Sequence, residues 1–236
     1  FNDLPSVNLI ADEALQRAIG KIGQSKLDSG RYDMILENRA SGRLMYALLG
    51  PLNARSIQQK QSFLEDKKGE KIGSAKLTLI DDPFIKRGLG SRLFDGDCIA
   101  SQKRVIIDKG VLNEYYVDWY YGRKLGMEPT TGSSSNTVFA YGEKSREEII
   151  RQTKKGILVT SFIGGNSNST TGDFSYGVMG SYIENGKIMK PVNEMNISGN
   201  LSELMMNLSE AGNDPYEYSS LKSPTMLFKN VYFSGV

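Results

Sequence analysis

The segment GILVTSFIGGNSNSTTGDFSYGVMGSYIENGKI, residues 156–188, determines the fold class. An apolar run at 157–163 predicts a buried strand, and the alternating residues at 174–183 predict a second strand. A loop rich in glycine, serine, threonine and asparagine joins them, and Asn185-Gly186 after the second strand favours a type I′ hairpin turn. We expect a strand–loop–strand edge whose backbone N–H groups approach a ligand; the alternative is a tight connection between two core strands.

The rest of the chain adds helices and further strands to this unit. Helical patterns occupy 10–22, 38–49, 53–64, 145–155 and 200–208, and strand patterns occupy 32–36, 77–80, 104–107, 111–115 and 225–233. Ser145 and Glu148 form a capping box, and Gly156 is expected to end that helix. Residues 130–137 are expected to form a flexible loop. Because strands and helices do not alternate as βαβ units, we predict an α+β fold: a mostly antiparallel β-sheet with helices packed against it.

Composition excludes several classes of function. The 236 residues are 39% hydrophobic, enough for the core of one large domain or two small ones. Lysine and arginine number 29 against 27 acidic residues, so there is no electrostatic footprint for nucleic acid. No apolar run approaches the ~20 residues of a membrane span. We therefore expect a cytoplasmic protein that binds neither nucleic acid nor membrane.

The start of the chain and its single cysteine carry two further expectations. Phe1 stands where an initiator methionine would, and no signal-like segment follows, so we expect a fragment that starts inside a longer protein. Cys98 excludes an intrachain disulfide. Its neighbours are acidic, which favours an inert thiol.

The chain contains no histidine. This excludes Ser-His-Asp and Cys-His triads and the usual zinc ligand sets. A serine or threonine hydrolase would also lack a base to activate its nucleophile. Asp81-Asp82 before Pro83 is better explained as a turn at the end of a strand than as a catalytic carboxylate pair.

Several motifs occur in an order that resembles one family. They are Gly164-Gly165-Asn166, the run Thr171-Gly172-Asp173-Phe174-Ser175-Tyr176-Gly177, the following hairpin, PVNEMNISGNL at 191–201, and Gly212-Asn213-Asp214. This order, over most of residues 30–236, resembles the C-terminal region of the TldD/PmbA family, historically labelled modulators of DNA gyrase. Residues 1–236 are therefore identified as a C-terminal domain of this type, without the N-terminal domain that family members carry.

The resemblance also bears on metal chemistry. In the zinc-bearing branch of the family, a helix in this region carries a His-Glu-x-x-x-His pattern that binds catalytic zinc. The corresponding helix here is NRASGRLMYALLG at 38–50, which offers no imidazole and, beyond Glu37 just ahead of it, no carboxylate. The chain is thus similar to the PmbA (TldE) branch. We expect no cofactor and no catalytic residue in this chain, and zinc in a partner subunit.

The residues that match the family motif are the expected site. They are Gly164, Gly165, Asn166, Thr171, Gly172, Asp173 and Ser175. We expect them to shape an edge where an extended peptide adds as a strand. Asp173 is expected to accept nearby backbone N–H groups, and Phe174 to anchor the loop in the core. The alternative is that these residues only shape the scaffold.

The resemblance implies a non-catalytic subunit of a zinc peptidase assembly that degrades or matures flexible peptides. The chain would supply chamber wall and peptide-binding edge, as a homodimer or paired with a zinc-bearing TldD-like relative. A non-enzymatic, homodimeric peptide-binding scaffold is the first alternative. A regulator, as the gyrase label implies, is the second.

Overall fold

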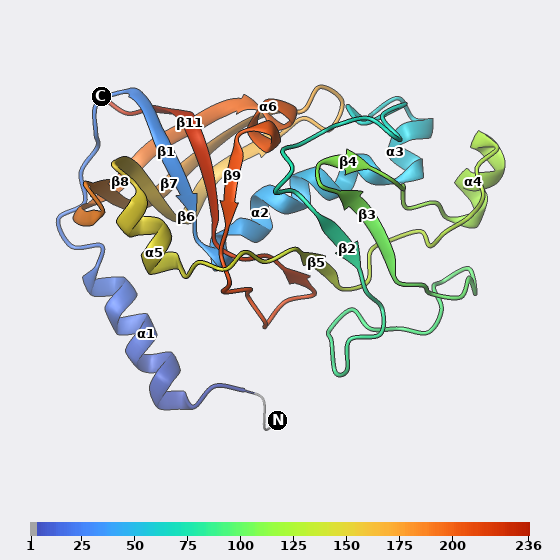
Figure 1. Ribbon diagram of the computed structural model, residues 1–236, viewed down its shortest axis with the longest axis horizontal. Coiled ribbons are helices and arrows are strands. Elements are labelled where there is room, and N and C mark those ends of the chain that lie inside the picture. The colour runs from blue at the N-terminus through green and yellow to red at the C-terminus, as the bar shows by residue number, and fades with distance from the viewer. Residues whose placement is uncertain (1–3) are drawn as a thin grey trace.

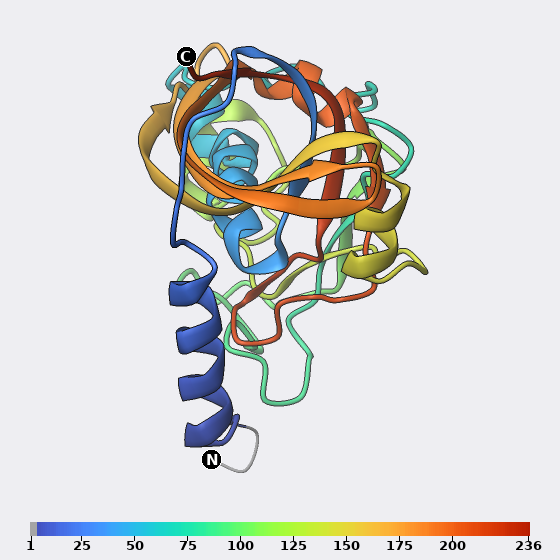
Figure 2. The same cartoon turned by 90° about the vertical axis from the view of Figure 1, so that its left-hand side faces the viewer.

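The computed structural model describes residues 4–236 as two sheets with helices between and around them (Figure 1). The larger sheet has the order β1-β6-β7-β8-β11-β9, and β1 also pairs with β11. Its strands are β1 (Gly30–Leu36), β6 (Lys155–Ser167), β7 (Asp173–Glu184), β8 (Lys187–Asn200), β9 (Leu208–Ala211) and β11 (Met226–Ser234). Because β1 joins β11, strands β1, β6, β7, β8 and β11 close into a ring, which is visible in Figure 2.

Strands β1 and β6 of this ring bury side chains on both faces. Figure 2 shows helix α2 (Asn38–Leu49) framed by the ring, and its Leu44, fully buried, shares the main core with Met34 of β1. Ile35, the next residue of β1, points to the opposite face of the sheet. There it joins a second apolar cluster with residues of α5 (Arg146–Gln152). Burial on both faces explains why the end of β1, residues 34–36, and the start of β6, residues 157–159, are continuous apolar runs rather than alternating ones.

The smaller sheet has the order β10-β5-β2-β3-β4. Its strands are β2 (Leu79–Asp81), β3 (Arg104–Asp108), β4 (Val111–Leu112), β5 (Thr137–Phe139) and β10 (Leu221–Lys222). The remaining helical elements are η1 (Gly50–Leu52), α3 (Ala54–Gln58), α4 (Trp119–Leu125) and α6 (Leu201–Met206). The predicted α+β class is confirmed, and the pairing is antiparallel except between β1 and β6 and between β10 and β5.

Two predicted local motifs are confirmed. Asn185 and Gly186 both have positive φ, 48° and 77°, as a type I′ turn between β7 and β8 requires. Ser145 and Glu148 form both hydrogen bonds of a capping box at the start of α5. Local sequence therefore indicates where β7 turns into β8 and where α5 begins.

Several predicted boundaries are wrong. The helix expected at 53–64 is confined to Ala54–Gln58, and the one expected to reach residue 155 ends at Gln152. Gly156 does not stop that helix, because it lies in β6 opposite Asp33 of β1. The apolar strand expected to end at 163 continues to Ser167, since β7 pairs with the glycine-rich residues as well.

Two segments combine buried and exposed residues. Asn136 is fully buried in the segment 130–137 that was expected to be a flexible loop, and its side-chain amide donates to the carbonyl of Asp82. Of the aromatic residues at 115–121, Tyr115 and Tyr116 are buried whereas Trp119 is about half exposed. The first two serve the core, and the third lies at the start of α4.

Helix α1 (Val7–Ile19) stands apart from the body of the molecule (Figure 1). The helix expected at 10–22 is present three residues earlier, and none of its 13 residues is buried. Val7 and Ile19 are 81% and 50% exposed. Within residues 4–236, no helix combines the length and apolarity needed to cross a membrane.

Candidate functional site

The residues of the expected site gather at one end of the β6–β7 hairpin. Gly164, Gly165 and Asn166 lie in β6, and Asn166 is directly opposite Ser175 of β7. Thr171 and Gly172 form the turn, and Asp173 begins β7. The motif residues are thus close in space as well as in sequence, although Gly164 to Asn166 belong to a strand and not to the loop expected there.

Side chains hold the turn of this hairpin. Asp173 accepts hydrogen bonds from the Thr171 hydroxyl at 2.7 Å and from the Asn200 side-chain amide at 3.0 Å. The hydrogen bonds from Thr171, and then from Asn200, lower the pKa of Asp173. The carboxylate therefore fixes the turn through side-chain donors, and not through the backbone N–H groups that were expected. Phe174 is 6% exposed and stacks on Tyr176 at 5.9 Å, so its expected role as an anchor is confirmed.

One edge of β6 has no strand beside it. β7 pairs with β6 along its length, but β1 pairs only with residues 156–159. Beyond Val159, no strand within residues 4–236 pairs with the other side of β6, which we call the open edge (residues 160–167). The open edge begins where the Glu37 N–H donates to the carbonyl of Val159 at 3.0 Å. An unpaired edge offers backbone donors and acceptors to an extended chain.

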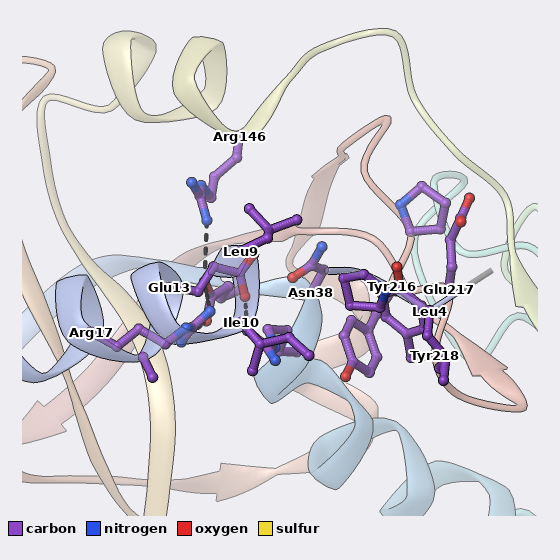
Figure 3. A pocket seen from close by; sticks show the side chains of 15 residues that line it. Leu4, Leu9, Ile10, Glu13, Arg17, Asn38, Arg146, Tyr216, Glu217 and Tyr218 are labelled. Carbon is purple, nitrogen blue, oxygen red and sulfur yellow. Dashed lines mark hydrogen bonds and ion pairs between the residues drawn. The ribbon is translucent and has the colours of Figure 1, made fainter. Parts of the chain in front are cut away.

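A cavity of about 690 Å³ lies where α1 approaches the N-terminal end of α2 (Figure 3). Apolar side chains of α1, including Leu9 and Ile10, line one side, and Tyr216 and Tyr218 line another. A neighbouring cavity of about 710 Å³ shares Glu37, Arg17 and Arg146 with it and extends to Thr160 and Ser161 at the start of the open edge. The two cavities together therefore join the N-terminal end of α2 to β6.

Glu37 is the buried charge of this site. Its side chain is 4% exposed and accepts hydrogen bonds from Arg17 of α1 at 2.7 and 3.1 Å and from Arg146 of α5 at 3.1 Å. The two guanidinium groups are 37% and 39% exposed, so they bring the counter-charge in from the surface. Two cations around one buried carboxylate satisfy its oxygens without a metal ion.

These residues do not fit a zinc ion. The Glu37 carboxylate is engaged by guanidinium groups, and the Asn38 amide donates to the carbonyl of Asp214 at 2.7 Å. Arg39, next on α2, brings a positive charge to the same place and pairs with Glu13. Within residues 4–236, no three histidine, cysteine or acidic side chains lie close enough to form a metal cage. A carboxylate paired with guanidinium groups and an amide bonded to the backbone are not the ligand set that activates a zinc-bound water.

Sequence reasoning missed the arginines of the site. Arg17 and Arg146 are 20 and 109 residues from Glu37 in the chain. Arg43, which reaches the open edge, is 122 residues from its partner Gly165. The helical pattern at 10–22 predicted a helix there, but it did not indicate that this helix contributes an arginine to a cavity.

Removing Arg17 should release α1 from the site. Because α1 buries none of its residues, the ion pairs Arg17–Glu37 and Arg39–Glu13 are the main attachments. We expect Arg17→Ala to raise amide hydrogen exchange in residues 7–19 at least about fivefold, the effect of losing roughly 1 kcal/mol. The melting temperature should change little. Arg31→Ala, which removes an exposed arginine outside the site, is the control; equal exchange in both variants would contradict this attachment.

Comparisons with known proteins agree with this architecture. Residues 29–235 match the family model described as the PmbA/TldA metallopeptidase C-terminal domain. The metalloprotease PmbA of Escherichia coli O157:H7 is 29% identical over 237 residues, which cover 100% of this chain and 53% of that protein. A metalloprotease of Methanothermobacter thermautotrophicus is 31% identical over 212 residues, 84% of this chain and 46% of that one. The chain thus spans about half the length of these curated relatives.

Two solved structures share the fold. One, from Bacteroides thetaiotaomicron, is named as a candidate modulator of DNA gyrase. It has a TM-score of 0.97 and 47% identity, and the match covers 100% of this chain and 54% of that one. TldE from Thermococcus kodakarensis has a TM-score of 0.88 and 25% identity, over 97% of this chain and 56% of that one. With the match of the family model to residues 29–235, these likenesses show that the chain belongs to the PmbA/TldA metallopeptidase family and contains its C-terminal domain.

Proposed function

We propose that this chain is the PmbA-like, non-catalytic part of a zinc peptidase assembly that degrades or matures flexible peptides. In this proposal it contributes chamber wall and the open edge of β6, and a relative that keeps the histidine pattern contributes the metal. The observation that carries the proposal is the open edge, whose first residues, Thr160 and Ser161, line the cavity of about 710 Å³ that also contains Glu37. An extended peptide would add there as a strand, held by backbone hydrogen bonds that tolerate many sequences.

The donor set supports a division of labour between two subunits. Glu37 is neutralised by two arginines, and the chain has no histidine. A subunit of this kind can orient a peptide, but the activated water must come from elsewhere. The names of the relatives, metalloprotease and TldE, are consistent with either role within the family.

A peptidase assay on mixtures tests the proposal. This chain alone should be inactive on an unstructured peptide, and a mixture with a histidine-bearing relative should cleave it and lose activity to a chelator. Ile163 lies in the open edge and is the extra residue of a β-bulge, without a register partner in β7. Ile163→Pro removes one backbone N–H from this segment at the position where the ladder with β7 is already irregular. We expect about a tenfold loss of rate in the mixture from one or two lost hydrogen bonds.

The control is Ile163→Ala, which shortens the side chain and keeps the N–H. It should retain most of the activity. Activity and bound zinc in this chain alone would contradict the proposal. If the mixture and the chain alone are both silent but peptide still binds, the chain is a non-enzymatic peptide-binding scaffold.

A further inference from the structure

We propose that Arg43 binds a carboxylate of the peptide on the open edge, and that this carboxylate sets the direction in which the peptide lies. The inference rests on the proposed function and specifies which end of the peptide lies where. It assigns a recognition role to an arginine of α2, on the helix that faces the open edge.

Two contacts hold the Arg43 side chain in place. Its Nη2 donates to the carbonyl oxygen of Gly165 in β6 at 2.9 Å, and its guanidinium lies 5.4 Å from the centre of the Tyr176 ring. A hydrogen bond on one side and a cation–π contact on the other restrict a side chain that is otherwise exposed. The guanidinium is therefore held at the Gly165 end of the open edge before any peptide arrives.

The charge of Arg43 is uncompensated. No carboxylate in residues 4–236 forms an ion pair with it. The arginines near the other end of the open edge differ in this respect: Arg17 and Arg146 pair with Glu37, and Arg39 pairs with Glu13. A guanidinium carries several N–H donors in a planar fork, and Gly165 takes only one of them. The remaining donors suit a carboxylate, which the fork can bind in bidentate fashion.

The length of the open edge limits the ligand. Just before the open edge the carbonyl of Val159 is occupied by the Glu37 N–H, and two residues before its end the carbonyl of Gly165 is occupied by Arg43. Backbone groups between these two points remain for a short segment of peptide. A chain that fills this segment ends next to the guanidinium.

The strand β1 indicates the direction of that peptide. β1 runs parallel to β6 and leaves it at Leu36, opposite Val159, where the chain turns into α2. A peptide in the place that β1 vacates continues its line and direction, with its C-terminal end toward Gly165. That direction brings a C-terminal carboxylate to Arg43, whereas the reverse direction would bring an ammonium group to a fixed cation.

The test compares peptides that differ only at the C-terminus. The probes are dansyl-Gly-Thr-Val-Thr-Ala with a free carboxylate, the same peptide as its amide, and the amide of dansyl-Gly-Thr-Val-Thr-Glu. Their binding to this chain is measured by fluorescence anisotropy. We expect the free acid to bind about tenfold more tightly than the alanine amide, the usual effect of one charged hydrogen-bonding contact at a partly exposed site.

Arg43→Gln should remove this preference by bringing the ratio of acid to amide affinity close to one. The ratio is the readout because a purely structural effect on β6 would weaken both peptides equally. Arg43→Lys should keep part of the preference, since it retains a charge without the fork. Arg123→Gln is the matched control: Arg123 also stacks on an aromatic ring, that of Trp119 at 5.4 Å, but it lies on α4, outside the site.

The outcomes distinguish failure of the inference from failure of the proposed function. A preference for the acid that Arg43→Gln abolishes supports the inference. A glutamate amide that gains the same preference would show that a side-chain carboxylate serves equally well. Equal affinity of acid and amide for the unmodified chain would overturn the inference and leave the open edge as a binding site. Failure of every peptide to bind would overturn the proposed function and the inference with it.

Discussion

Replacing Asp81 with alanine is expected to lower the free energy of unfolding by about 3–5 kcal/mol, the cost of breaking a buried ionic network. Asp81 is 2% exposed and accepts hydrogen bonds from the Ser135 N–H at 2.6 Å and hydroxyl at 2.8 Å. It also lies 3.5 Å from Arg104, whose side chain is 8% exposed. The variant leaves buried donors without this acceptor, so the melting temperature should fall by roughly 10 °C. Urea unfolding followed by circular dichroism measures the change.

The adjacent Asp82→Ala is the matched control. Burial alone would raise the pKa of Asp82, but hydrogen bonds from Lys103 and from the Phe84 N–H outweigh it and lower the pKa. Lys103 is 60% exposed, so solvent screens the pair and its loss should cost no more than about 1 kcal/mol. Equal costs for the two variants would show that the network around Asp81 contributes little.

Gly165→Ala is expected to destabilise the chain by about 3 kcal/mol or more, since it combines backbone strain with a steric clash. Gly165 has φ = 93°, in the region that glycine favours. A Cβ atom there would overlap the carbonyl oxygen of Ser175 and lie 2.6 Å from the Cα of Tyr176, so β6 and β7 must move apart. Because Arg43 donates to this same residue, the open edge should change shape as well. Thermal melting and the anisotropy assay would record the two effects separately.

The neighbouring Gly164→Ala separates strain from clash. Gly164 has φ = 140°, but a Cβ atom there meets no heavy atom within 4 Å. We expect a cost of about 1–2 kcal/mol from strain alone. A cost as large as that of Gly165→Ala would mean that close packing against Ser175 is not what requires glycine.

The turns and helix starts of the fold could be predicted from local patterns, because they depend on residues that are close together in the sequence. The Asn185-Gly186 turn and the Ser145 capping box depend on residues that are neighbours in the chain. The glycine-rich part of β6 was predicted as a loop because glycine is rare in strands. Pairing with β7 outweighs that propensity, and β-bulges at 160 and 163 accommodate the irregular backbone.

The candidate site was only half predictable. The motif residues of the β6–β7 hairpin were found because they are contiguous in sequence. An edge at this hairpin was expected, but its extent was not predictable, because it begins where β1 stops at Leu36, which depends on the register with β6. The contacts of Arg17, Arg146 and Arg43 depend on how α1, α5 and α2 meet in space, and no single-sequence pattern encodes these distances.

The closure of the ring has a consequence for how the chain reaches its native state. β1 pairs with β11, and Gly30 lies opposite Phe233, so two segments about 200 residues apart must meet before the ring can close. Such non-local pairing makes folding slow, and synthesis delivers β1 long before β11. Until then β1 and β8 each expose an edge that could pair with another chain. Nascent or truncated chains that lack residues 226–234 should therefore be prone to aggregation, and a chaperone that shields β1 during translation should raise the yield of folded protein.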